Sequence, residues 1–318
     1  MNRRKNDLIQ LGILVALGAS TILSLTIPQL SQERTSAPIR ALSVLTREAD
    51  GAVWNNTRMG MEQAADELGA ELRFLTLSSP NDTQEQISLV QREIEGGADA
   101  LIISPTDPDA LSRTLNELGS PCPVIATESP LSAASALIAP DDTLVGQGLS
   151  QALLEDWTGG AVLLVDTSIS PKNATARRLA AAQEVLETAH IPTIIEKIAT
   201  PIAPEELTQL VKASNCQWVM TFEPSATLLA AQQMAGLQKP PCLYGVGSSA
   251  AITAQLESGT IQAVAAWSDY AAGYLAVEYA ISATTGRTAA PAPLTFSILR
   301  GEDIYAPDNQ KLLFPVIS

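Results

Sequence analysis

The chain has 318 residues, of which 46% are hydrophobic, so it is long enough to bury the cores of two modest domains. Its formal net charge is −15 at pH 7, and no cluster of lysine and arginine occurs beyond the first few residues. Such an acidic surface repels phosphate backbones, which argues against nucleic acid as a partner.

The N-terminus, residues 1–36, is typical of an export segment. Arg3, Arg4 and Lys5 precede an apolar run from Leu8 to Ile27 that is long enough to span a bilayer. Two interpretations stay open, an uncleaved membrane anchor and a signal peptide removed near Thr35-Ser36-Ala37. Both predict an extracytoplasmic protein, either held at the outer face of the cytoplasmic membrane or secreted.

Strand and helix patterns alternate along the rest of the chain, and two of the helices are predicted over Thr83 to Glu95 and Ala174 to Ala189. This alternation predicts an α/β fold with doubly wound parallel sheets, and ten strands favour two sheets, with a break after Thr127. The predicted strands are Ala41 to Leu45, Glu71 to Leu77, Ala100 to Ser104, Val124 to Thr127, Ser135 to Ile138, Ala161 to Asp166, Thr193 to Ala199, Gln217 to Phe222, Leu243 to Val246 and Ala263 to Trp267.

Cys216 and Cys242 begin two consecutive strands that should be neighbours in a parallel sheet. In an exported chain a disulfide between them is one interpretation, and two small buried thiols are the other. The third cysteine, Cys122, has no predicted partner. No spacing of Cys and His suggests a metal site.

Catalytic motifs are absent from the sequence, so we expect neither an enzyme nor a cofactor. The single histidine, His190, closes a helix before Pro192, where a polar cap is the expected role. The turn from Gly245 to Ser249 follows a strand, but it lacks the third glycine of a dinucleotide fingerprint.

Several stretches together resemble the ribose/galactose type of periplasmic binding protein, a type I solute-binding family. They are AADELGAEL, GGADALIISPTDPDAL, PVIATES and AWSDYAAGYLAVEYA, and they occur in the family's order from about Ala41 to the C-terminus. The resemblance implies two α/β lobes joined by three crossings. The first lobe would comprise residues 37–127 and 268–290, and the second residues 128–267 and 291–318.

The resemblance also implies where a ligand would bind. Trp54 matches the family's stacking aromatic residue, and Asp50 lies near its hydrogen-bonding side chain. Glu128 matches the acid at the first crossing, and Arg178 matches the pocket arginine, with Arg177 as a competitor. The chain departs from the family at Phe222-Glu223, Gly247 and Trp267, where sugar binders carry polar groups, and this puts a ribose-like ligand in doubt.

Trp54, Phe222 and Trp267 are therefore expected to line one cleft with flat apolar faces, unless Phe222 and Trp267 only fill a gap between the lobes. The main interpretation is an extracytoplasmic protein that captures a carbohydrate for an ABC-type importer. The alternative is a membrane-tethered sensor that presents a nucleoside or an organic cation to a signalling receptor. A regulator of the lactose-repressor type would need a basic helix-turn-helix where the apolar segment stands.

Overall fold

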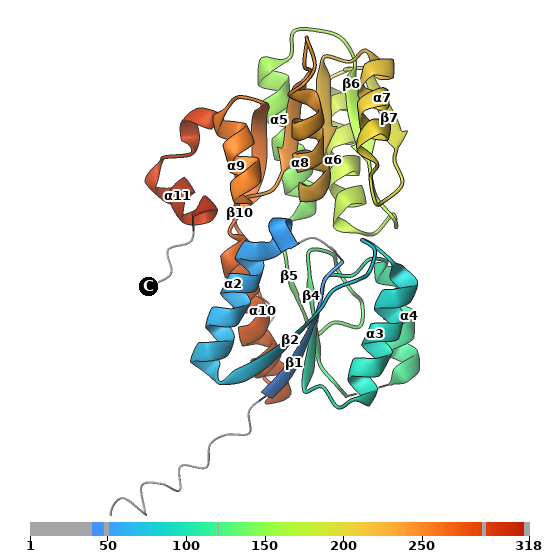
Figure 1. Ribbon diagram of the computed structural model, residues 1–318, viewed down its shortest axis with the longest axis vertical. Helices are drawn as coiled ribbons and strands as arrows, with labels where there is room; N and C mark the ends of the chain where they lie inside the picture. Colours follow the sequence, from blue (N-terminus) through green and yellow to red (C-terminus); the bar gives the residue numbers. More distant parts are fainter. Residues whose placement is uncertain (1–39, 48–50, 120, 288–290, 315–318) are drawn as a thin grey trace, which may run out of the picture. The chain divides into compact units, whose positions relative to one another are not determined.

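The computed structural model describes residues 40–47, 51–119, 121–287 and 291–314, which form two α/β lobes (Figure 1). The predicted export segment and Asp50 lie outside these residues. None of the described helices combines the length and apolarity that a membrane crossing requires.

The first lobe is built on a parallel sheet with the order β2-β1-β3-β4-β5. Its strands are β1 (Arg40–Leu45), β2 (Ala70–Leu75), β3 (Ala100–Ile103), β4 (Val124–Thr127) and β5 (Ala136–Ile138). The strand order reverses at β1, which has β2 on one side and β3 on the other. In open α/β sheets, ligands bind beyond the carboxyl ends of strands at such a switch point.

Helices cover both faces of this sheet (Figure 1). They are α2 (Gly51–Leu68) and α10 (Asp269–Thr284) on one face, and α3 (Thr83–Glu95) and α4 (Pro108–Leu118) on the other. Buried aliphatic side chains fill both layers, which is why the central strands are continuous apolar runs. Helix α10, which comes from the C-terminal part of the chain, thus completes a lobe whose other elements belong to the N-terminal half.

The helices α2 and α10 pack unusually closely because glycines meet backbone. A β-carbon at Gly273 would lie 1.9 Å from the carbonyl oxygen of Thr57, and one at Gly60 would lie 2.0 Å from that of Tyr270. No side chain larger than hydrogen fits at either position without moving a helix. These contacts fix the N-terminal turns of both helices, which carry residues of the candidate site.

The second lobe has a six-stranded sheet with the order β11-β10-β9-β8-β6-β7, in which only β11 is antiparallel to its neighbour. Its strands are β6 (Val162–Asp166), β7 (Thr193–Lys197), β8 (Trp218–Thr221), β9 (Cys242–Val246), β10 (Ile261–Trp267) and β11 (Phe296–Leu299). Its helices are α5 (Asp142–Asp156), α6 (Ala174–Thr188), α7 (Pro204–Ser214), α8 (Pro224–Met234), α9 (Ala250–Glu257), the 3₁₀ turn η1 (Gly301–Asp303) and α11 (Pro307–Leu313).

The first change of lobe differs from the expected one. The prediction placed it after Thr127, but β5 pairs in parallel with β4 and belongs to the first sheet. The chain therefore leaves the first lobe between Ile138 and the start of α5. At this point Pro140 bridges to Leu294, and the Leu294 amide donates to the Ala139 carbonyl at 2.9 Å, so two of the crossing segments run side by side.

The three cysteines are free thiols, which rules out the disulfide interpretation for Cys216 and Cys242 in this structure. The neighbouring strands were predicted correctly, because β8 and β9 do pair. However, Cys216 lies before the first residue of β8, and its thiol contacts the carbonyl of Ser214 rather than the other strand.

Candidate ligand-binding cleft

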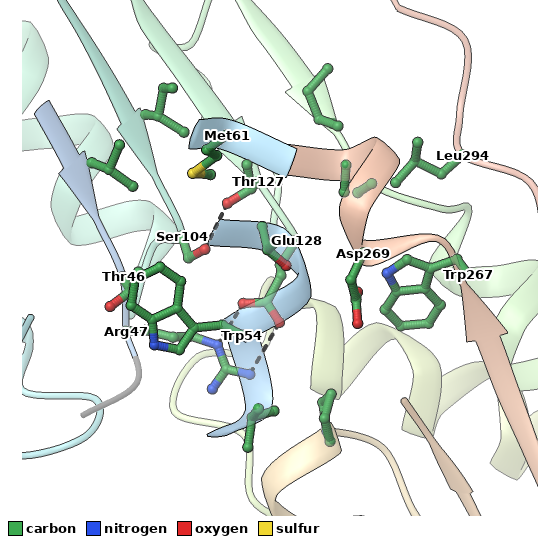
Figure 2. A pocket seen from close by; sticks show the side chains of 18 of the residues that line it. Thr46, Arg47, Trp54, Met61, Ser104, Thr127, Glu128, Trp267, Asp269 and Leu294 are labelled. Atoms are coloured by element: carbon green, nitrogen blue, oxygen red, sulfur yellow. Dashed lines mark hydrogen bonds and ion pairs between the residues drawn. The ribbon is translucent and has the colours of Figure 1, made fainter. Parts of the chain in front are cut away.

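A cavity that is partly open to solvent lies beyond the carboxyl ends of β1, β3 and β4 (Figure 2). The helices α2 and α10 form one wall, and Pro224 of α8 contributes from the second lobe. The lining residues are Val44, Leu45, Thr46, Arg47, Val53, Trp54, Thr57, Met61, Ile102, Ser104, Thr127, Glu128, Ile138, Ala139, Pro140, Pro224, Trp267, Asp269, Ala272 and Leu294. The cavity thus lies at the switch point of the first sheet.

Two indole rings lie on opposite sides of the cavity in the view of Figure 2, with the carboxylates of Glu128 and Asp269 between them. Trp54 lies in the first turn of α2 and packs against Phe74 at a centroid distance of 5.6 Å. Its indole nitrogen is buried and has no hydrogen-bond partner among the described residues. Trp267 ends β10. Flat faces of this kind suit the apolar face of a sugar ring.

Arg47, which follows β1, joins acceptors from both lobes. Its Nε donates to Glu128 Oε2 at 2.7 Å, and its Nη1 donates to Asn81 Oδ1 at 3.2 Å and to Glu223 Oε2 at 3.0 Å. Glu223 comes from the second lobe and its side chain is only 2% exposed. The ion pair between Arg47 and Glu223 therefore links the two lobes at the edge of the cavity.

Glu128 occupies a backbone conformation with φ of 60°, which turns the chain sharply at the end of β4. Burial alone would raise the pKa of Glu128, but the charge and hydrogen bonds of Arg47 outweigh burial and hold this pKa below its ordinary value. Glu128 is therefore an ionised hydrogen-bond acceptor at neutral pH.

Asp269 is the first residue of α10. Burial raises its pKa to about 6, even though hydrogen bonds from Ser248 and Trp267 act in the opposite direction. The Ser248 hydroxyl donates to Asp269 Oδ2 at 2.5 Å. Asp269 thus presents a second carboxylate to the cavity.

Arg178 is fully buried and does not line the cavity. Its Nε donates to Asp142 Oδ1 at 2.8 Å, and a terminal nitrogen donates to the Phe222 carbonyl at 3.2 Å. Its guanidinium carbon lies 4.9 Å from the centre of the Trp267 ring. Arg177 pairs with the same aspartate at 3.1 Å. Arg178 therefore packs against the indole of Trp267 without lining the cavity itself.

Three other predicted site residues lie away from the cavity lining. Phe222 is wholly buried in the core of the second lobe, because its side chain points to the α5 and α6 face of the sheet. Gly247 has φ of +130°, and a β-carbon there would meet Ile252 at 2.5 Å, so its role is in the backbone turn. Glu223 lines a neighbouring groove and reaches the cavity only through Arg47.

Sequence reasoning missed Arg47 and Asp269. Both stand two residues after a strand end, Arg47 after β1 and Asp269 after β10, and this position is the signal that could have identified them. Among the described residues, no group of His, Cys, Asp and Glu side chains could hold a metal ion. The donor set of carboxylates, hydroxyls and indoles is suited to recognising a polar organic ligand.

Two α/β lobes with a cavity at the strand ends, linked by three chain crossings, define a two-lobed solute-binding protein. The chain belongs to the periplasmic binding protein family, because the family model described as periplasmic binding protein domain matches residues 42–288. This membership confirms the family, the fold class and the solute-binding role that the sequence predicted.

Known proteins similar to the chain include the ribose import binding protein of Bacillus subtilis (strain 168). It is 29% identical over 125 residues, which cover 38% of this chain and 40% of that protein, so the match spans less than half of the relative's length. A solved carbohydrate transporter solute-binding protein from Agrobacterium radiobacter in complex with D-arabinose has a TM-score of 0.78 at 19% identity, covering 87% of this chain and all of that one. A solute-binding protein from Agrobacterium vitis with bound D-fucose has the same TM-score at 16% identity, covering 86% of this chain and all of that one.

Proposed function

We propose that the protein captures a sugar between its two lobes outside the cytoplasm and delivers it to an ABC-type importer. The observation that carries this proposal is the pair of indole rings, Trp54 and Trp267, which flank two carboxylates in one cavity. Aromatic faces and carboxylate acceptors together are the usual means of binding a sugar ring. The sugars named for the solved relatives support the same ligand class.

The mechanism is closure of the lobes about the crossing segments. Hinge closure around a ligand is the motion established for periplasmic binding proteins. A sugar that contacts Trp54 from the first lobe and Trp267 at the end of β10 binds the closed state better than the open one. The ligand therefore shifts the equilibrium toward closure by its difference in affinity. The closed form would then present both lobes to the permease.

The comparisons favour sugar capture for import and give no support to the tethered sensor. The N-terminal segment would serve export, either as a retained anchor or as a removed signal. The intact mass of the mature protein distinguishes these two outcomes. A chain that begins near Pro38 indicates a signal, and a membrane-associated chain that retains Leu8 to Ile27 indicates an anchor.

Stacking on the two indoles gives the first prediction. Trp54→Ala and Trp267→Ala should each weaken sugar binding by about 1–3 kcal/mol, because each removes one aromatic face. Isothermal titration of the purified protein against a monosaccharide panel measures this loss. Trp157→Ala is the control, because Trp157 lies outside the cavity and bonds to the Gly160 carbonyl. Unchanged affinity in both cavity variants would remove the stacking proposal.

A further inference from the structure

The cavity has an apolar end. Met61 from α2, Ile138 from β5, Ala272 from α10 and Leu294 from the last crossing segment line it. Met61, Ile138 and Ala272 are buried, and all four residues belong to or pack against the apolar core of the first lobe. This end of the cavity is thus an extension of that core, and in Figure 2 Met61 and Leu294 lie on the side away from Arg47.

Charged groups also line the cavity, below Met61 and Leu294 in the view of Figure 2. Glu128, Asp269 and Arg47 supply them, and Arg47 is already paired with Glu128 and Glu223. Hydroxyl groups line the cavity as well, among them those of Ser104 and Thr127, which hydrogen-bond each other at 2.6 Å, and that of Thr57. A ligand therefore meets carboxylate acceptors on one side and hydrocarbon on the other.

This asymmetry has a consequence for the exocyclic carbon of a hexose. A hydroxyl group buried among Met61, Ile138 and Leu294 would lose its water without gaining a strong partner, which weakens binding. A methyl group at the same place would add buried apolar area and fill the space. A pentose would leave this end of the cavity unfilled, and an acidic sugar would meet two carboxylates.

We propose that the preferred ligand is a neutral 6-deoxyhexose, whose methyl group sits against Met61, Ile138, Ala272 and Leu294 while its ring hydroxyls face Glu128 and Asp269. This inference rests on the proposed function of sugar capture. It goes beyond that function because it assigns the substrate class and the residues that select it.

Matched pairs of sugars test the inference on the unmodified protein. Each pair differs only in CH₃ against CH₂OH, and the pairs are D-fucose with D-galactose, L-fucose with L-galactose, L-rhamnose with L-mannose, and 6-deoxy-D-glucose with D-glucose. Isothermal titration should find at least one pair in which the deoxy sugar binds ~10- to 100-fold more tightly than its hydroxylated partner.

The outcomes separate the inference from the proposed function. If sugars bind but the hydroxylated member of every pair binds as tightly or more tightly, the deoxy preference is overturned and sugar capture stands. If no sugar in the panel, pentoses included, binds at millimolar concentration, sugar capture itself fails and the inference fails with it.

Two matched variants on α2 test the selecting residue. Met61→Gln introduces an amide at the apolar end and should lower the ratio of deoxy to hydroxylated affinity at least ~5-fold, because the amide can bond the extra hydroxyl. Met59→Gln makes the same change on the same helix at a half-buried residue that does not line the cavity, and should leave the ratio unchanged. Equal ratios in the two variants would contradict the assignment of Met61. Circular dichroism verifies that both variants are folded. If Met61→Gln does not fold, the sugar pairs on the unmodified protein still decide the main inference.

Discussion

Arg47 and Glu223 illustrate how much a single buried ion pair is expected to contribute. The two side chains are 10% and 2% exposed, so removing one charge leaves the other poorly hydrated. Glu223→Gln should lower the free energy of unfolding by about 1–3 kcal/mol in urea titrations. The control is Glu62→Gln, which breaks an ion pair with Arg58 whose members are both 48% exposed, and should cost less than about 0.5 kcal/mol. Similar small losses in both variants would show that the interlobe pair is not stabilising.

Asp269 predicts a particular dependence of stability on pH. Its pKa in the folded protein, about 6, lies above the ordinary value of 3.8, so the folded state binds its proton more tightly than the unfolded chain does. As the pH rises from about 4 to 6, the free energy of unfolding of the wild type should therefore fall relative to that of Asp269→Asn. The lower relative value should persist at pH 7. Thermal or urea unfolding of both proteins at pH 4 and pH 7 measures this difference. A difference that is the same at both pH values would contradict the raised pKa.

Individual site residues were harder to predict than the class of protein. Trp54, Glu128 and Trp267 line the cavity, and their contact with a ligand stays a prediction. Phe222 also follows a strand, but alternation along β8 turns its side chain into the core, and one residue of register decides that outcome. Sequence position alone does not give this register.

The contact between α2 and α10 gives a prediction at the level of secondary structure. Gly273→Ala places a methyl group against the backbone of Thr57, so the helices must separate or shift. The expected loss is about 1–3 kcal/mol of unfolding free energy, measured by denaturant titration. Gly236→Ala is the matched control, since a β-carbon there meets nothing within 4 Å. If the two variants are equally stable, the helices are not held as closely as described.

Most elements followed from the sequence because central strands of a parallel sheet are continuous apolar runs. Val124–Thr127 and Thr83–Glu95 have the predicted bounds. The edge strand β11 was missed because Phe296–Leu299 is short and follows a segment rich in Pro and Ala, so it lacks a distinct pattern. The position of β5 was misjudged because a three-residue strand carries no information about which sheet it joins.

Several polar contacts join the lobes among the residues that the structure describes, including the bond from Ser248 to Asp269. Besides Arg47 and Glu223, the Ala174 amide donates to the Ser129 hydroxyl at 2.9 Å, and Lys172 Nζ donates to Asp109 at 2.9 Å. Contacts between lobes contribute to ligand affinity if closure is coupled to binding, even where they do not touch the ligand.

Lys172 tests this coupling. Lys172→Ala should weaken the affinity for a sugar by only ~2- to 5-fold, because an exposed ion pair contributes little free energy. The effect should be measured at low salt, because salt screens the pair. The difference from wild type should vanish as ionic strength rises. The control is Lys311→Ala, which breaks the pair with Asp308 inside α11 and should not change the affinity. Identical titration curves for the two variants at low salt would argue against closure as the binding step.

A single residue, Ser268, separates the end of β10 from the start of α10. Trp267 therefore belongs to the sheet of the second lobe, whereas the helix that begins at Asp269 is fixed to the first lobe by the backbone contact at Gly273. Any hinge motion must change the position of the indole relative to the carboxylate that it bonds. Because indole emission depends on the polarity and hydrogen bonding around the ring, Trp267 should report the motion of the hinge. Opening and closing should then be visible as a change in tryptophan fluorescence without any attached dye.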